Sequence, residues 1–370
     1  METVLRLQSS YAVTHRADGV VLASLERDDR FVLKGAGPQV AEALRRLAKG
    51  VTAEQSEAEL AEAAGLDPAY AGRLLTALDR RGVLVRRPRD QDLSALPGTD
   101  LYDRQVRFFG FYETQQRSGP DLNDRLQQRS VLVVGVGGLG GWLALMLARL
   151  GVRRIIAVDH DRVELSNLHR QILYGRTDIG VPKVEAARGR LCEVDDDIRY
   201  EPHELEVTDP ADLAPLLDGV DLVINPFGFL PDLVRTAYAV GTAALHAGTP
   251  CLHMPGPQIV GPITIPGRTA CLACVERVFE AELGLGAALS TWKASSSEGQ
   301  TFMAALAPRQ AISGGLAVWE ATRFLAEFEP SPLLEHAISI DINAYEAHRK
   351  IKVERDVACP SCGDGMLTGA

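Results

Sequence analysis

The sequence has no long apolar run and no excess of positive charge, and these two absences narrow the classes of protein it can belong to. No stretch reaches the roughly 18–20 apolar residues that span a bilayer, and Met1 precedes a polar segment rather than a basic region with an apolar core. The 39 basic residues face 49 acidic ones, a net charge of −10, whereas general binding of phosphate backbones needs clustered Lys and Arg. We therefore expect a cytoplasmic protein with no membrane and no nucleic acid among its partners.

The composition also excludes long disordered or fibrous stretches. Hydrophobic residues make up 46% of the chain and charged residues 24%, which is ordinary for folded globular proteins. At 370 residues the chain is about twice as long as one compact core needs, so we expect two domains.

Cysteine is scarce, but four of the six cysteines form two Cys-x-x-Cys pairs. In a reducing compartment such pairs indicate zinc ligands before disulfides, because four thiolates can share one tetrahedral ion. Two unrelated redox or incidental pairs are the alternative. The pairs are too far apart for a zinc finger and suit a clip that ties the chain end to the middle of a domain. The four predicted metal ligands are Cys271, Cys274, Cys359 and Cys362.

Residues 1–90 have the pattern of a separate, small, winged-helix-like α+β domain. A Thr52–Gln55 capping box and Asp67 before Pro68 predict two helix starts. A polar linker, residues 91–100, separates this domain from residues 101–370. Strands are predicted at Val4–Leu7, Val20–Leu25, Phe31–Leu33 and Val83–Val85, with three helices between the third strand and the last.

The order of these elements resembles the PqqD-like domain known as the RiPP recognition element. That resemblance implies capture of the leader of a precursor peptide, which adds to the domain as a strand. Nucleic-acid binding is the alternative for a winged-helix-like domain. It is disfavoured because the third helix has Arg73, Arg80 and Arg81 among acidic residues, with no amide or aromatic side chains to read bases.

The second domain alternates strands and helices, which predicts a doubly wound, mostly parallel, Rossmann-like α/β sheet. Its first strand, Ser130–Val134, ends at a glycine-rich loop that opens a helix, where backbone amides can approach phosphates. Asp159 ends the next strand, where a carboxylate can accept hydrogen bonds from ribose hydroxyls. These features alone would favour a nicotinamide-dependent dehydrogenase. The loop glycines are Gly135, Gly137, Gly138 and Gly140.

The residues after Asp159 favour triphosphate cleavage over hydride transfer. They bring carboxylate, amide, guanidinium and ammonium groups close to the glycine loop, as a departing pyrophosphate requires but a hydride does not. A further arginine, Arg104, precedes the domain. The cluster comprises Asp161, Ser166, Asn167, Arg170 and Lys183.

Together these segments resemble the ThiF/MoeB/MccB superfamily, relatives of ubiquitin-activating enzymes that adenylate a peptide or protein C-terminus with ATP. The resemblance spans residues 101–363 and rests on Gly-x-Gly-Gly-Leu-Gly, Ser-Asn-Leu-x-Arg-Gln, Pro-Lys-Val-Glu and both cysteine pairs. It implies that Asp159 holds ribose, that Asn167, Arg170 and Lys183 hold phosphates, and that Arg104 reaches into the ATP site of the partner in a homodimer. It also implies structural zinc on the four cysteines.

Two departures from the family pattern concern magnesium and thiol chemistry. The family places an Asp for Mg²⁺ after the next strand; a direct count puts Gly228 there, and only a shifted loop brings Asp232, which could equally cap the following helix. The segment Leu285–Met303 has no cysteine for substrate transfer, and Cys192 is expected to be a core residue within a helix.

We therefore expect an enzyme, an ATP-dependent adenylyltransferase that uses ATP, Mg²⁺ and Zn²⁺ and acts on the C-terminal carboxyl or an amide of a ribosomally made precursor peptide. The N-terminal domain would capture the leader, and the second domain would activate the core. Two alternatives remain: a non-catalytic protein that presents the leader to a separate modifying enzyme, and an adenylyltransferase of a sulfur-carrier protein. A downstream modifying enzyme is a further expected partner.

Overall fold

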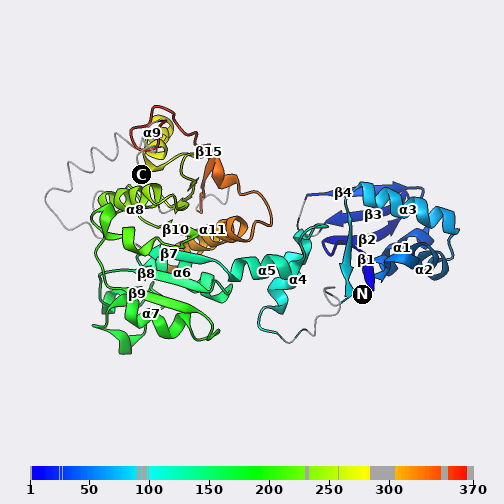
Figure 1. Cartoon of the computed structure of the whole chain (residues 1–370), viewed down its shortest axis with the longest axis horizontal. Coiled ribbons are helices and arrows are strands. Elements are labelled where there is room, and N and C mark those ends of the chain that lie inside the picture. The colour runs from blue at the N-terminus through cyan, green and yellow to red at the C-terminus, as the bar shows by residue number, and fades with distance from the viewer. Residues whose placement is uncertain are drawn as a thin grey trace. The chain divides into compact units, whose positions relative to one another are not determined.

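The computed structural model describes residues 2–24, 26, 28–89, 93, 98, 100–229, 233–256, 258–283, 305–342 and 349–364. The chain forms two compact units, Met1–Arg125 and Leu126–Ala370 (Figure 1). In the described part of the chain, no helix is both long enough and apolar enough to cross a membrane.

The first unit contains two three-stranded antiparallel sheets, with strand orders β5-β1-β6 and β2-β3-β4. The helices pack their apolar faces on a shared core that includes Leu22, Leu44 and Leu78. The elements are β1 Thr3–Leu7, β2 Tyr11–Arg16, β3 Gly19–Ser24, β4 Arg30–Lys34, α1 Pro38–Ala48, β5 Val51–Thr52, α2 Ser56–Ala64, α3 Pro68–Arg80, β6 Leu84–Pro88, α4 Asp103–Phe109 and α5 Gly119–Gln127, the last of which continues into the second unit.

One of the two predicted helix starts is confirmed and the other is wrong. The Asp67 carboxylate accepts a hydrogen bond from the Tyr70 amide at 3.0 Å, as expected at the start of α3. The Thr52–Gln55 capping box is absent, because the Thr52 hydroxyl donates to Glu2 at 2.9 Å and its amide donates to Glu59 at 2.9 Å. These partners hold Thr52 in β5, and α2 begins only at Ser56.

A buried arginine explains why the first unit extends past residue 90. Arg87 on β6 donates to the carbonyls of Thr114, of Gln115 at 2.9 Å and of Arg117 at 2.9 Å. Gln8 also donates to the Glu113 carbonyl at 3.2 Å. These hydrogen bonds attach the segment between α4 and α5 to the β5-β1-β6 sheet and its neighbouring loop, so α4 belongs to the first unit.

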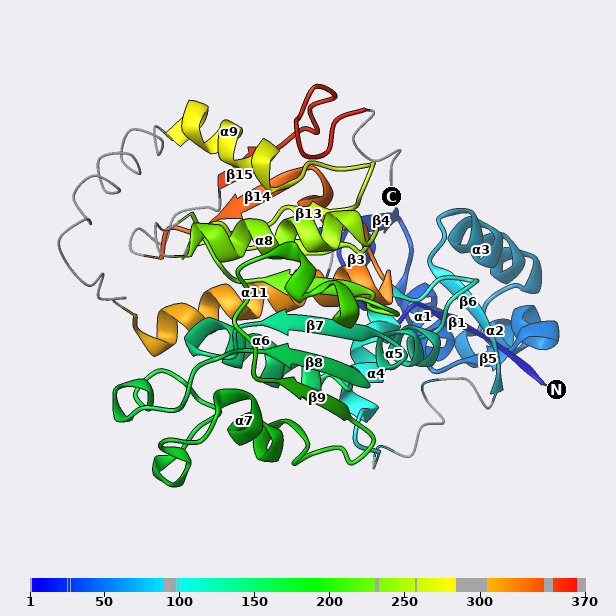
Figure 2. The ribbon, with the colours of Figure 1, turned by 60° about the vertical axis from the view of Figure 1, so that its left-hand side comes forward.

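The second unit is built on a six-stranded sheet with the order β13-β11-β10-β7-β8-β9, parallel except for β13. β10 and β8 lie on either side of β7, so the winding of the sheet reverses next to β7, the place where such sheets bind ligands. Figure 2 shows β7, β8 and β9 side by side. The strands are β7 Ser130–Val134, β8 Arg154–Val158, β9 Arg199–His203, β10 Leu222–Asn225, β11 Cys251–His253 and β13 Ile263–Thr264. The predicted mostly parallel α/β sheet is confirmed.

Helices cover this sheet, and a smaller sheet, β12-β14-β15, stands beside it. α6 and α11 pack against each other, while α8 packs on β10 and β11. α7 ends at Leu191, so Cys192 is a half-buried residue just after the helix rather than a core residue inside it, which corrects the expectation. The elements are α6 Gly138–Arg149, α7 Lys183–Leu191, α8 Val234–His246, β12 Ile259–Val260, α9 Leu272–Leu283, α11 Ala307–Ala326, β14 His336–Ser339 and β15 Arg349–Lys352.

Candidate functional site

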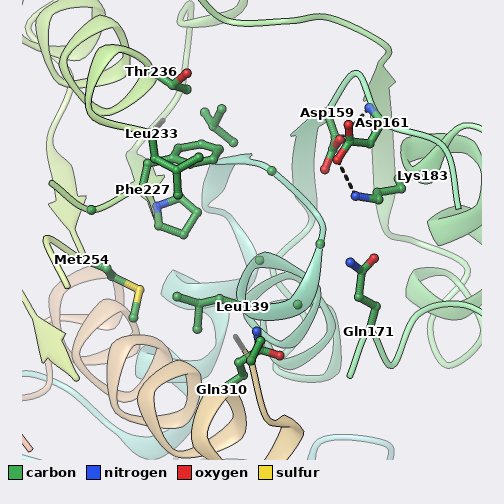
Figure 3. Close-up of a pocket in the computed structure, with 18 of the residues that line it drawn as sticks. Leu139, Asp159, Asp161, Gln171, Lys183, Phe227, Leu233, Thr236, Met254 and Gln310 are labelled. Atoms are coloured by element: carbon green, nitrogen blue, oxygen red, sulfur yellow. Dashed lines mark hydrogen bonds and ion pairs between the residues drawn. The ribbon is translucent and has the colours of Figure 1, made fainter. Parts of the chain in front are cut away.

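A cavity of about 450 Å³ opens at the carboxyl ends of β7, β8 and β10. Polar side chains from the β8 end and α7 line one side, as Figure 3 shows, and apolar side chains line another. Of the residues predicted from the sequence, the cavity is lined by Gly135, Gly137, Gly138, Gly140, Asp159, Asp161, Arg170 and Lys183.

The glycine loop has a conformation and a close packing that favour glycine. Gly135 has φ +80°, a left-handed conformation that favours glycine, and a Cβ atom there would lie 2.9 Å from the Phe227 ring. The loop then turns into α6, whose first backbone amides lie at the cavity wall. A helix N-terminus bordering a cavity is a favourable position for a phosphate group.

Backbone amides hold the Asp159 side chain in place by donating hydrogen bonds to both of its carboxylate oxygens. One oxygen accepts from the Val136 amide at 2.8 Å and the other from the Asp161 amide at 2.8 Å. The side chain is largely buried, and this burial raises its pKa above the usual range, while nearby Lys183 acts in the opposite direction. A carboxylate held this firmly at the end of β8 is well placed to receive ribose hydroxyls.

Lys183 is the first residue of α7 and brings a buried ammonium group to the same cavity. Its Nζ lies 2.6 Å from the carboxylate of Asp161, and only 7% of the lysine side chain is exposed, against 52% for Asp161. The lysine amide also donates to the Asp161 carbonyl at 2.9 Å. An ammonium group that lines the cavity can pair with a phosphate.

The Ser166–Gln171 segment divides into residues that line the cavity and residues that shape the turn. Arg170 lines the cavity, and its guanidinium donates to the Ser166 carbonyl at 2.7 Å. Gln171 also lines it, and its Oε1 is buried with no partner among the described residues. Asn167 and Ser166 do not line it; the Asn167 amide oxygen instead accepts from the Glu164 amide at 3.1 Å.

Two other predicted site residues do not belong to the described part of the second unit. Arg104 is exposed on α4 in the first unit. Asp232 lies outside the described residues. Gly228, the position reached by a direct count, does line the cavity, and a Cβ atom there would lie only 2.7 Å from the Pro255 carbonyl oxygen.

The cavity has walls that sequence reasoning did not identify. Phe227, Leu233 and Met254 form an apolar side (Figure 3). Arg309 and Gln310 reach the cavity from the first turn of α11. The motifs do not mark these two residues, because apolar periodicity can locate a helix but says nothing about which polar residues face a cavity.

The four cysteines of the two pairs come together as a buried cluster at the start of α9 and beyond β15. Their sulfur atoms all lie within 4.8 Å of one another, with separations of 3.9, 3.6 and 3.7 Å for three pairs. Four thiolates about 2.3 Å from a tetrahedral zinc ion would be about 3.8 Å apart, so the cluster fits zinc. Gly363 closes the turn, since a Cβ atom there would lie 2.5 Å from the Cys359 carbonyl oxygen.

A doubly wound sheet with a glycine loop, a backbone-held Asp and a buried Lys defines a nucleotide-binding α/β enzyme. Residues 102–361 match the ThiF family. The chain is 34% identical over 253 residues to the sulfur carrier protein adenylyltransferase of Thermus thermophilus, covering 66% of this chain and 86% of that protein. It is 29% identical over 265 residues to the molybdopterin-synthase adenylyltransferase of Escherichia coli, covering 71% and 95%.

Among solved structures, E. coli MccB with AMPCPP and MccA has a TM-score of 0.76 and 18% identity, with 97% of this chain and 100% of that chain covered. That likeness shows the fold, and its coverage of 97% of the chain includes the first unit. The chain belongs to the ThiF family and is an adenylyltransferase that uses ATP.

Proposed function

We propose that this enzyme adenylates the C-terminal carboxyl or an amide of a ribosomally made precursor peptide. The observation that carries the proposal is the cavity itself, which joins Asp159, Lys183 and the start of α6 in one space and continues toward an apolar wall. The polar side suits the ribose and phosphates of ATP, and the remaining space suits the end of a peptide. Leu205 and Val207 offer an apolar surface for the base.

The chemistry needs positioning and charge neutralisation rather than a protein nucleophile. A substrate carboxylate oxygen attacks the α-phosphorus, the bond from that phosphorus to the bridging oxygen breaks, and pyrophosphate leaves. Attack by an amide nitrogen gives a phosphorus–nitrogen bond instead, and the nitrogen loses a proton. Lys183 and Arg170 stabilise the charge that moves onto pyrophosphate, and Asp159 holds the ribose.

We propose Mg²⁺ as the companion of ATP. Magnesium is commonly held by one or two carboxylates together with substrate phosphates. Among the described residues, the Asp161 carboxylate faces the cavity and is half exposed, so it fits this role, and Asp232 stays a second candidate. Zinc on the cysteine cluster would be structural, because four thiolates leave no coordination position for a substrate.

The proposed leader site is the open edge of β4. Within the described residues, β4 pairs with β3 on one side only. In an antiparallel pair, every second residue of a strand forms its backbone hydrogen bonds with the partner strand. The Ser24 amide donates to the Asp29 carbonyl and the Gly35 amide donates to the Asp18 carbonyl, so the backbone N–H and C=O groups of Phe31 and Leu33 face β3. Those of Val32 face the open edge, where a peptide can add as a strand.

Side chains next to this edge support the same interpretation. Val32 is 38% exposed, and Tyr70 on α3 is 37% exposed. The Arg81 guanidinium lies 5.1 Å from the centre of the Phe31 ring, which connects the end of α3 to β4. Recruitment of a leader would also give the first unit a role in the reaction. The MccB structure, which covers both units, holds MccA.

We further propose a cytoplasmic homodimer in which Arg104 enters the partner's ATP site, with a separate enzyme modifying the activated peptide. Activation of a sulfur-carrier protein is the second candidate function, and the 34% identity to the Thermus enzyme favours it.

Pyrophosphate exchange into ATP tests the proposal directly. Candidate precursor peptides should stimulate exchange, and Lys183→Ala and Arg170→Ala should reduce it to background because both charges face the cavity. Lys352→Ala on the exposed face of β15 is the matched control and should exchange normally. Stimulation by a sulfur-carrier protein but by no peptide would favour the second candidate, and exchange unaffected by Lys183→Ala would refute the assigned site.

A further inference from the structure

We propose that Arg309 and Gln310 form the subsite that holds the last residue of the substrate peptide. This role rests on the proposed peptide adenylation and assigns a substrate-positioning function to the first turn of α11, where the ThiF motifs quoted above have no residue.

Gln310 lies against the glycine loop. A Cβ atom at Gly138 would be 2.3 Å from Nε2 of Gln310 and 2.6 Å from its Oε1, so the amide occupies the place of the missing side chain. Gly138 is the first residue of α6. The Gln310 amide is therefore fixed beside the helix end at which we place the reacting phosphate.

The Gln310 amide lies on the side of the cavity opposite the residues that we propose hold the ribose and phosphates. In Figure 3, Gln310 lies next to Leu139, whereas Asp159, Asp161 and Lys183 gather across the glycine loop from it. A nucleotide whose ribose sits on Asp159 and whose phosphates sit at the loop approaches Gln310 with its phosphate end. The space beyond, toward Leu306, is left for the acyl substrate.

Two buried polar atoms at this end have no partner among the described residues. They are Oε1 of Gln310, an acceptor, and Nε of Arg309, a donor. Leaving such atoms unpaired is costly, so both should be satisfied when the site is filled. The ligand must therefore bring a donor for one and an acceptor for the other.

This requirement identifies the part of the substrate that binds here. Phosphates at the helix end and a terminal carboxylate are acceptors only, so neither can pair with the Gln310 oxygen. The N–H of the last peptide bond is a donor whose nitrogen lies two bonds from the terminal carbonyl carbon, the carbon that carries the attacking oxygen or nitrogen. Gln310 can accept that N–H through Oε1 and donate through Nε2 to the acyl oxygen, while the Arg309 cation attracts a carboxylate more than a neutral amide.

The test uses the full-length enzyme and hexapeptides carrying each of the twenty amino acids at the C-terminus, as free acids and as amides. For the best peptides, Gln310→Leu should raise the peptide KM in pyrophosphate exchange about tenfold, the loss of one good hydrogen bond. The KM for ATP should stay within about twofold, which also shows that the variant is folded. Arg309→Ala should impair acids more than amides.

Gln310→Glu provides a second variant of the same shape. It keeps the acceptor, loses the donor and adds negative charge, so acids should again suffer more than amides. Equal peptide KM values for wild type and Gln310→Leu would overturn the subsite while leaving peptide adenylation intact. If wild type neither exchanges with nor binds any hexapeptide in the presence of a non-hydrolysable ATP analogue, the proposed function and the subsite both fall.

Discussion

His253 is a fully buried titratable residue at the end of β11, and its surroundings fix its protonation. The Thr264 hydroxyl lies 2.9 Å from Nε2 and donates to the Ala270 carbonyl at 2.7 Å, so it must accept a hydrogen bond from that nitrogen. Nδ1 then has no proton and faces the Asn225 amide at 3.4 Å. Burial of this neutral ring lowers its pKa to about 4.

We predict that His253 makes the second unit acid-sensitive. The pKa of His253 is lower in the folded than in the unfolded chain, so unfolding takes up a proton as pH falls from about 6.5 toward 4. The stability lost in this way is about 2 kcal/mol by pH 5. His253→Gln should flatten the pH dependence of urea unfolding, followed by tryptophan fluorescence, because all three tryptophans lie beyond residue 126. Removing the exposed His15 by His15→Gln is the control, and parallel profiles for wild type and His253→Gln would contradict the prediction.

At the level of single residues, site residues within a motif can be predicted from the sequence, whereas site residues from distant parts of the chain cannot. The glycines, Asp159 and Lys183 reach one cavity because the ends of adjacent parallel strands always meet at one sheet edge. Asn167 was close in sequence but shapes a turn. Arg309 and Gln310 could not be predicted, because their position depends on how α11 packs against α6.

Among the elements, the cysteine cluster joins the start of α9 to the segment after β15. Arg355 reinforces the loop by donating to the Cys362 carbonyl at 2.7 Å, and Arg277 pairs with Asp356. The Cys-x-x-Cys spacing predicted that each pair holds a metal, and the fold shows that the two pairs lie close enough to share one ion. A metal held by both segments stabilises the folded chain, because the unfolded chain has no preformed site.

We predict that Cys359→Ser reduces zinc from about one ion per chain and lowers the melting temperature by about 5–10 °C. Metal analysis and thermal unfolding measure the two effects. Cys192→Ser, which removes a half-buried cysteine outside the cluster, is the matched control and should keep its zinc. A Cys359→Ser protein with full zinc content and unchanged melting would rule out the clip.

For the whole molecule, a shared ATP site requires two chains, and mixing inactive variants tests this requirement. Arg104→Ala and Lys183→Ala should each be inactive. If Arg104 acts in the partner's site, random mixing makes half of the dimers mixed, each with one complete site, and restores about a quarter of wild-type exchange. Mixing Arg104→Ala with the Arg104→Ala/Lys183→Ala double variant restores nothing in this arrangement. No recovery in the first mixture, despite proven subunit exchange, would indicate that Arg104 acts within its own chain.

The first unit should contribute to activity on a full precursor by pairing the leader with the open edge of β4. Val32→Pro removes a backbone donor that faces the open edge of β4, not β3, so the sheet should tolerate it. It should raise the KM for a precursor with its leader about tenfold and leave the KM for short leaderless peptides and for ATP unchanged. Val32→Thr, which keeps the donor, is the control.

Backbone pairing and apolar burial depend little on salt, whereas contacts to several nucleic-acid phosphates would weaken steeply as the salt concentration rises. Normal use of the precursor by Val32→Pro, or tight and strongly salt-dependent binding of DNA instead of the leader, would show that β4 is not a leader site.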